Sequence, residues 1–304
     1  MGADASRVDA GGRDAGGRDG GACAREVRLS VEASEPSTVV LIVDASSSMQ
    51  RDFGAGLSRW EAVREALTGR DGVIRRLEDR VPFGLIRYSA SFMCPTLESR
   101  PAELRAGDGI ATLLLATPPG GSTPTAETLR EARADVARLA GDSTGPVSFV
   151  LATDGEPVPC DSTRDEAEIR RRVVEQVGLA YDEGVRTFVL SVGADLSEGH
   201  LQDLANAGAN VGPGDPDAPA WRADDPAALT ELIATAIGAA VACVARLPWS
   251  EANPCDAEVE LDGDPLICDD ADGFRIEGNQ LLFAGAACAA WESGARALVR
   301  TACE

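Results

Sequence analysis

Three residues with oxygen-bearing side chains follow the first apolar segment of the chain. Residues 38–44 are Thr-Val-Val-Leu-Ile-Val-Asp, which predicts a buried strand that ends at Asp44. Ser46 and Ser48 follow, so one short loop carries a carboxylate and two hydroxyl groups. Oxygen atoms of this kind are the ligands that Mg²⁺ prefers, in near-octahedral geometry. Because three side chains cannot complete such a shell, a metal site here requires further oxygen ligands from other loops.

Two later loops supply residues of the required type. Residues 120–125 are Gly-Gly-Ser-Thr-Pro-Thr, in which the glycines permit a tight turn and the proline suits the first turn of a helix. Thr123 is therefore expected just before a helix with its hydroxyl group free, and Thr125 is the alternative. Residues 147–153 form a second apolar segment, and Asp154 follows it directly. Residues of these types also form turns and cap helices. That interpretation needs a separate reason for each of the three loops, whereas one metal site accounts for all of them.

The order of these three segments resembles the metal-ion-dependent adhesion site of the von Willebrand factor type A domain family. That site consists of Asp-x-Ser-x-Ser, a distant threonine and a distant aspartate, which match Asp44, Ser46, Ser48, Thr123 and Asp154. The resemblance covers roughly residues 36–242, and it favours Thr123 over Thr125 because Thr123 comes directly after the Gly-Gly-x element. It implies that the hydroxyl groups bind the metal directly and that the aspartates often act through water. The implied ion is Mg²⁺, with Mn²⁺ or Ca²⁺ as alternatives.

Strand and helix patterns alternate along the main part of the chain. Apolar segments predict strands at 38–44, 82–90, 147–153 and 185–192, and a loop that contains Cys94 follows the second of them. Helical patterns are present at 59–79, 108–116, 124–140, 164–183, 197–207 and 225–242. This alternation predicts an α/β fold with a doubly wound, mostly parallel sheet flanked by helices, Rossmann-like as in the resembled family. Ligands of such sheets bind at the carboxyl ends of strands, where Asp44 and Asp154 are expected.

Composition divides the chain into three expected regions. Residues 1–22 repeat Asp, Ala, Gly and Arg and predict a disordered linker. Residues 23–242 form the expected von Willebrand factor type A domain. Residues 243–304 hold five of the eight cysteines and predict a small disulfide-stapled β-rich domain with a short helix near 286–293. Its clustered aspartates do not fit a calcium-binding EF-hand, because Cys268 stands where the first aspartate is needed.

The cysteines favour an oxidising compartment. Their number is even, there is no Cys-x-x-Cys, and the chain has a single histidine, so a zinc site is disfavoured. Many connectivities are possible. The pairs that we expect are Cys94–Cys160, Cys23–Cys243, Cys255–Cys268 and Cys288–Cys303. The first of these would join two loops near the predicted metal site.

We expect an extracytoplasmic protein, either secreted, periplasmic or anchored to a surface by a lipid. No signal segment opens the chain. Residues 1–22 resemble the linker behind a signal peptide or lipoprotein anchor, so we expect a removed leader or a natural start further upstream. The alternative is a cytoplasmic protein with reduced cysteines. No apolar run is long enough to predict a transmembrane segment.

The charge of the chain restricts its partners. It has 50 acidic and 28 basic residues, all of the basic ones arginine, and a net charge of −22. Such a balance argues against binding to nucleic acid or to anionic lipid, since both rely on basic residues. It is compatible with divalent cations and with basic partners. The oligomeric state is left open.

The residue types favour binding over catalysis. His200, the only histidine, is expected to face solvent on the helix 197–207, and no Gly-x-Ser-x-Gly motif accompanies the serines. Ser46 occupies the position at which an aspartyl phosphatase would carry its second aspartate. Hydroxyl ligands leave a cation electrophilic, and the resemblance implies that a Glu or Asp of a protein ligand completes its shell. The alternatives are a secreted metal-dependent hydrolase that uses the same ion and a structural envelope protein with a vestigial site.

Overall fold

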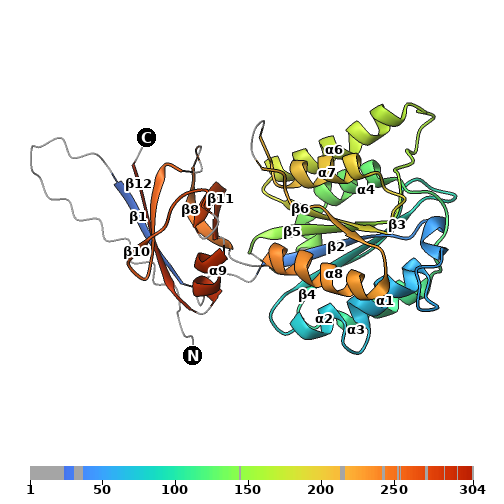
Figure 1. Ribbon diagram of the computed structural model, residues 1–304, viewed down its shortest axis with the longest axis horizontal. Helices are drawn as coiled ribbons and strands as arrows, with labels where there is room; N and C mark the ends of the chain where they lie inside the picture. The colour runs from blue at the N-terminus through green and yellow to red at the C-terminus, as the bar shows by residue number, and fades with distance from the viewer. Residues whose placement is uncertain are drawn as a thin grey trace, which may run out of the picture.

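The computed structural model describes residues 24–30, 37–143, 145–212, 216–241, 244–251, 253, 255–270, 273–283, 285–292 and 294–302. Figure 1 shows a large α/β part and a small, mainly β part side by side. The large part runs from the second strand to the eighth helix of the chain. Among the residues described, no helix combines the length and the apolar character needed to cross a membrane.

A six-stranded sheet forms the centre of the large part. Its order is β4-β3-β2-β5-β6-β7, and all neighbouring pairs are parallel except β3 and β4. The strands are β2 (Thr38–Asp44), β3 (Phe83–Ser89), β4 (Thr96–Glu103), β5 (Val147–Thr153), β6 (Arg186–Val192) and β7 (Trp221–Ala223). The predicted mostly parallel sheet is therefore confirmed.

The expected loop after residue 90 is wrong in part, because it contains the edge strand β4. Among the strands that the structure describes, β4 pairs with β3 alone, and most of its side chains are exposed or half-exposed. Its sequence, Thr-Leu-Glu-Ser-Arg-Pro-Ala-Glu, therefore lacks the apolar run that marks the buried strands. A polar edge strand of this kind resembles a loop in sequence.

Helices cover both faces of the sheet (Figure 1). One face carries α1 (Arg59–Thr68), α2 (Val73–Leu77), α3 (Gly107–Ala116) and α8 (Pro226–Val241). The other carries α4 (Thr125–Ala134), α5 (Val136–Leu139), α6 (Glu166–Asp182) and α7 (Glu198–Gly208). Successive residues of β2 point to opposite faces, so Leu41 packs in the first core and Ile42 in the second. Burial on both faces explains why β2 is apolar throughout.

His200 is buried, and the expectation that it faces solvent is wrong. Its exposed fraction is only 3%. It lies in the first turn of α7, where Leu201 and Leu204 pack against the sheet. Burial lowers the pKa of the imidazole below its usual value, so His200 favours its neutral form.

The small part contains two sheets around its own apolar core. One sheet has the order β1-β12-β9-β10, and the other pairs β11 with β8. Their strands are β1 (Ala24–Ser30), β8 (Val244–Glu251), β9 (Ala257–Leu261), β10 (Asp264–Pro265), β11 (Phe274–Phe283) and β12 (Arg296–Ala302). The helix α9 (Gly285–Glu292) packs Trp291 against Phe283, with ring centroids 4.9 Å apart.

The expected start of the large domain at residue 23 needs a correction. Residues 24–30 form β1, which pairs along its whole length with β12 of the small part. Val27 and Leu29 pack against the core of the small part, which explains this pairing. The large part is thus inserted between β1 and β8 of the small part.

Two of the expected disulfide bonds are confirmed. Cys94 and Cys160 are joined, as are Cys255 and Cys268. The expected pairs Cys23–Cys243 and Cys288–Cys303 lie outside the residues or side chains that the structure describes, as does the expected linker at 1–22. One hydrogen bond between the two parts runs from the Gln280 side-chain amide to the Gly184 carbonyl oxygen, over 2.9 Å.

Candidate metal site

The sheet brings Asp44 and Asp154 to the same edge. Asp44 is the last residue of β2, and Asp154 directly follows β5, which runs parallel to β2 and beside it. The chain leaves β2 toward β3 on one side, whereas β5 lies on the other, so this edge is the reversal point of the strand order. Such a point is the usual place for ligands in α/β sheets. Neither aspartate is exposed to solvent.

Hydrogen bonds connect both serines to Asp154. The Ser48 hydroxyl donates to Oδ1 of Asp154 over 2.6 Å. The Oγ atoms of Ser46 and Ser48 are 2.8 Å apart. Because the only hydroxyl proton of Ser48 is used on Asp154, Ser46 must be the donor in this second bond. Ser48 accepts this bond with one lone pair of its oxygen, and its other lone pair remains available to a cation.

Asp44 is held by a different set of donors. Its Oδ1 accepts the backbone N–H of Ser46, and its Oδ2 accepts the Thr153 hydroxyl, each over 2.8 Å. Burial, together with the charge of Asp154, raises the pKa of Asp44 from 3.8 to about 7. A cation at this edge would favour the ionised carboxyl, because opposite charges stabilise one another. Two buried carboxyl groups on one sheet edge suit a cation chemically.

The loop that contains Thr123 is fixed against the serine loop by the backbone. The Gly120 N–H donates to the Ala45 carbonyl over 2.7 Å. The Ser47 N–H donates to the Gly121 carbonyl over 3.0 Å, and the Gly121 N–H donates to the Ser47 hydroxyl over 2.9 Å. Arg87 supports the same loop from β3 by donating to the carbonyls of residues 117 and 118. These bonds place Thr123 beside the serine loop.

Thr123 and Thr125 differ in what their hydroxyl groups contact. Thr123 is buried, with an exposed fraction of 5%. Among the residues that the structure describes, its hydroxyl group nevertheless has no hydrogen-bond partner. The Thr125 hydroxyl instead lies 3.2 Å from the phenol oxygen of the buried Tyr88. An unpaired hydroxyl at a buried edge suits a metal ligand, whereas the Thr125 hydroxyl already has a structural role.

Replacing each threonine with valine separates these two roles. For Thr123→Val we expect Mg²⁺ affinity to fall about tenfold or more with little loss of stability, because an oxygen ligand is lost. For Thr125→Val we expect a loss of about 1 kcal/mol in stability and an unchanged Mg²⁺ affinity, because one hydrogen bond to Tyr88 is lost. Calorimetric titration and urea unfolding measure the two quantities. The reverse pattern would assign the ligand role to Thr125.

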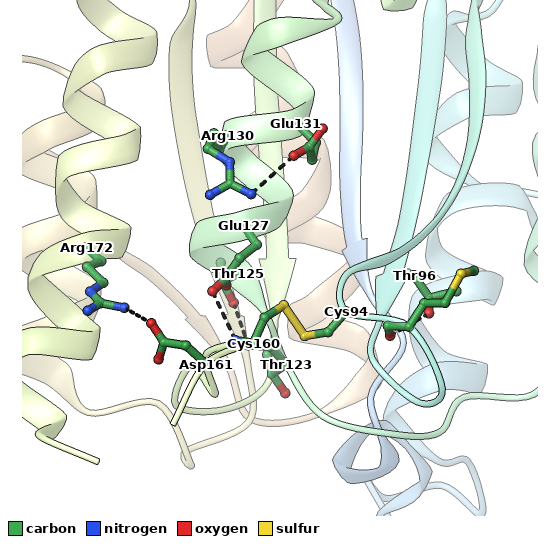
Figure 2. Close-up of a disulfide and its surroundings, with 11 residues drawn as sticks. Cys94, Thr96, Thr123, Thr125, Glu127, Arg130, Glu131, Cys160, Asp161 and Arg172 are labelled. Carbon is green, nitrogen blue, oxygen red and sulfur yellow. Dashed lines mark hydrogen bonds and ion pairs between the residues drawn. A yellow bond between two sulfur atoms is a disulfide. The ribbon is translucent and has the colours of Figure 1, made fainter. Parts of the chain in front are cut away.

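A disulfide bond ties the loop after β5 to the loop after β3. Figure 2 shows Cys94 and Cys160 joined close to Thr123. The Val158 N–H donates to the Thr123 carbonyl over 2.9 Å, and the Cys160 N–H donates to the Glu127 carboxylate over 3.0 Å. Backbone hydrogen bonds therefore connect the Thr123 loop to the serine loop and to the loop after β5, and the Ser48 hydroxyl connects the latter two.

The donor set fits a hard cation such as Mg²⁺. It consists of three hydroxyl groups and two carboxyl groups on one sheet edge, and hard cations take oxygen ligands. Ser46, Ser48 and Thr123 could offer neutral oxygens, with Asp44 and Asp154 behind them. Elsewhere in the described chain, one cluster has metal-ligand residue types, namely Cys255, Cys268 and Asp269. The two sulfur atoms of that cluster are joined in a disulfide, so it lacks the thiolates that a metal needs.

The sequence patterns did not identify three residues that contact the site. Thr153 donates to Asp44, Arg59 donates to Asp154, and Asp195 accepts from Arg59. Thr153 directly precedes Asp154, so its place in the sequence could have identified it as a residue near the site. Arg59 and Asp195 belong to no motif, and only the fold brings them to the site.

Comparison with known proteins identifies the fold. The sequence profile of the von Willebrand factor type A domain matches residues 38–234. The chain belongs to the von Willebrand factor type A domain family. The matched range begins at β2 and ends within α8, so it coincides with the large part of the structure. No curated protein sequence matches the chain.

Several solved structures share this fold at low sequence identity. The pilus adhesin SpaC from Lactobacillus rhamnosus GG, in its open conformation, has a TM-score of 0.52 and 17% identity. The alignment covers 91% of this chain but 40% of the adhesin, so the chain spans less than half of that protein. The manganese-loaded TRAP protein of Plasmodium vivax has a TM-score of 0.50 and 15% identity, with coverages of 79% and 90%. The PilB minor pilin from Streptococcus sanguinis has a TM-score of 0.50 and 15% identity, with coverages of 67% and 61%.

Proposed function

We propose that this protein binds a protein partner through a divalent cation, Mg²⁺ or alternatively Mn²⁺ or Ca²⁺, held by Ser46, Ser48 and Thr123. Asp44 and Asp154 stand behind these hydroxyls and balance the charge of the ion. A Glu or Asp of the partner completes the coordination shell. The proposal includes an extracytoplasmic location, which the two disulfide bonds support, because such bonds persist in oxidising compartments.

The directions of the hydrogen bonds around the site are the main support for this proposal. Ser48 directs its proton to Asp154, and each oxygen of Asp44 accepts a hydrogen bond from within the protein. The oxygens left over for an ion are mainly neutral hydroxyl oxygens. Neutral ligands do not cancel the charge of a divalent cation, so the ion keeps its attraction for an external carboxylate.

Exposed apolar side chains beside the site support contact with a protein. Phe92 and Met93 are exposed, and they immediately precede Cys94 of the disulfide near Thr123. The loop that carries them begins at Ala90, which exchanges two backbone hydrogen bonds with Ser122. Large exposed apolar side chains are favourable contacts for a partner surface.

The first experiment tests cation binding by calorimetric titration with Mg²⁺. We expect the wild-type chain to bind and the Asp44→Ala variant to lose at least about tenfold in affinity, since a buried charge that balances the ion is removed. Asp108→Ala, which changes an exposed aspartate on α3, is the matched control and should bind like the wild type. Equal binding by the wild type and Asp44→Ala would refute the site.

The second experiment tests for an acceptor of carboxylates. The probe is the capped peptide Gly-Glu-Gly, followed by saturation-transfer NMR with Mg²⁺ or with EDTA. We expect a signal that requires Mg²⁺, that disappears for Gly-Gln-Gly and that is absent in Asp44→Ala. Turnover of phosphate or ester substrates that needs Mg²⁺ and is lost in Asp154→Ala would instead support a metal-dependent hydrolase. A chain that binds neither cation nor peptide would support a structural envelope protein.

A further inference from the structure

A buried arginine lies directly behind the candidate metal site. Arg59, the first residue of α1, is 7% exposed. Its Nη1 atom donates to Oδ2 of Asp154 over 2.8 Å and to Oδ2 of Asp195 over 2.7 Å. One guanidinium group thus bridges a carboxylate of the site and a carboxylate on the loop after β6.

The surrounding chain is shaped to hold this guanidinium group. A capping box between Ser58 and Glu61 fixes the start of α1. Gly193 has a φ of +91°, and a Cβ atom there would lie 2.8 Å from the Nη2 atom of Arg59. Asp195 also pairs with Arg51, which anchors the far end of the bridge. The position of the guanidinium group therefore depends on α1, on the loop after β6 and on Asp154.

This contact makes the two oxygens of Asp154 unequal. Oδ1 accepts the Ser48 hydroxyl, and Oδ2 accepts Arg59. An oxygen in a charged hydrogen bond with a buried arginine is poorly available to a second cation, because the ion and the guanidinium group repel one another. Turning Asp154 toward the ion would also break a buried ion pair, which is costly.

We propose that Arg59 is a positioning residue that prevents Asp154 from binding the cation directly. The cation then keeps an additional water molecule between itself and Asp154, and its charge remains available to a partner carboxylate. Arg59 also neutralises one of the two buried carboxylates, so the ion is held less tightly than two free carboxylates would hold it. This inference rests on the proposed function, since it concerns the same cation.

The test uses Mn²⁺ alone as the probe. Electron paramagnetic resonance of free Mn²⁺ gives the affinity, and water-proton relaxation gives the number of water molecules on the bound ion. For Arg59→Met we expect one water fewer and an affinity about tenfold higher, because Asp154 is released toward the ion. Arg59→Lys retains a positive charge near Asp154 and should restore the wild-type water number. Arg171→Met, which removes an exposed arginine on α6 that pairs with Glu168 and Glu175, is the matched control and should match the wild type.

The outcomes separate this inference from the proposed function. Mn²⁺ binding by the wild type with the same water number and affinity in Arg59→Met would overturn the role of Arg59 alone. A wild-type chain that binds no Mn²⁺ would overturn both proposals. A crystal structure of the Mn²⁺-soaked wild-type chain gives a reading that does not depend on the folding of any variant. Asp154 bound directly to Mn²⁺ in that structure would overturn the inference, and a bridging water would support it.

Discussion

Replacing Gly121 with alanine is expected to destabilise the large part by about 4 kcal/mol and to abolish cation binding. Gly121 has a φ of +85°, a conformation that side chains with a Cβ atom rarely adopt. A Cβ atom there would also overlap the backbone carbonyl oxygen of Ala90, which cannot move aside like the end of a flexible side chain. The loop would have to shift, and Thr123 would shift with it.

The neighbouring glycine provides a control for this variant. A Cβ atom on Gly120 would meet no atom within 4 Å, so Gly120→Ala should change the stability by less than about 1 kcal/mol. Urea unfolding gives the stability of each variant, and calorimetric titration gives its Mg²⁺ affinity. Similar effects of the two substitutions would contradict this account of the loop.

Removing the disulfide bond between Cys94 and Cys160 is expected to have a comparably large effect on stability. The bond closes a sequence separation of 66 residues. Loop-closure entropy then predicts a loss of about 4 kcal/mol for the double variant Cys94→Ser/Cys160→Ser. Because Val158 and Cys160 lie on the loop that contacts Thr123 and Glu127, we also expect a lower affinity for Mg²⁺.

The second disulfide bond is the matched control. Cys255→Ser/Cys268→Ser opens a separation of 13 residues in the small part, for an expected loss of about 3 kcal/mol there. Hydrogen exchange of the amides in β2 and β5 reports on the large part specifically. Their protection should fall in the first double variant and stay unchanged in the second. Loss of Mg²⁺ affinity in the second variant would be inconsistent with independent roles of the two bonds.

The parts of the fold that depend on local patterns could be predicted from the sequence. The buried strands β2 and β5 are short apolar runs, and α8 begins where Asp225 caps its first turn, at the start of the helix predicted at 225–242. Asp44 and Asp154 follow from these strands, because the carboxyl ends of neighbouring parallel strands meet at one edge.

Features that depend on long-range contacts could not be predicted in this way. β1 pairs with a strand more than 260 residues later, and nothing in its own sequence identifies that partner. Arg59 contacts Asp154 and Asp195, which lie 95 and 136 positions later in the sequence. The local sequence at the start of α1 therefore does not indicate that Arg59 belongs to the metal site. His200 was expected to face solvent because histidine is polar. Its burial depends on how α7 packs against the sheet, which its own sequence does not indicate.

The antiparallel pairing of β1 and β12 gives the molecule a definite response to mechanical load. The large part is joined to β1 at one end of that strand, while the seven paired positions from Ala24 to Ser30 lie along its length. Tension applied between Ala302, which pairs with Ala24, and the large part therefore pulls β12 and β1 from opposite ends of their ladder, in shear. Shear loads all the hydrogen bonds of a strand pair together, whereas peeling breaks them one after another. A partner that pulls on the cation edge while residue 302 is held would thus load the β1–β12 pair in the direction in which the pair resists more force.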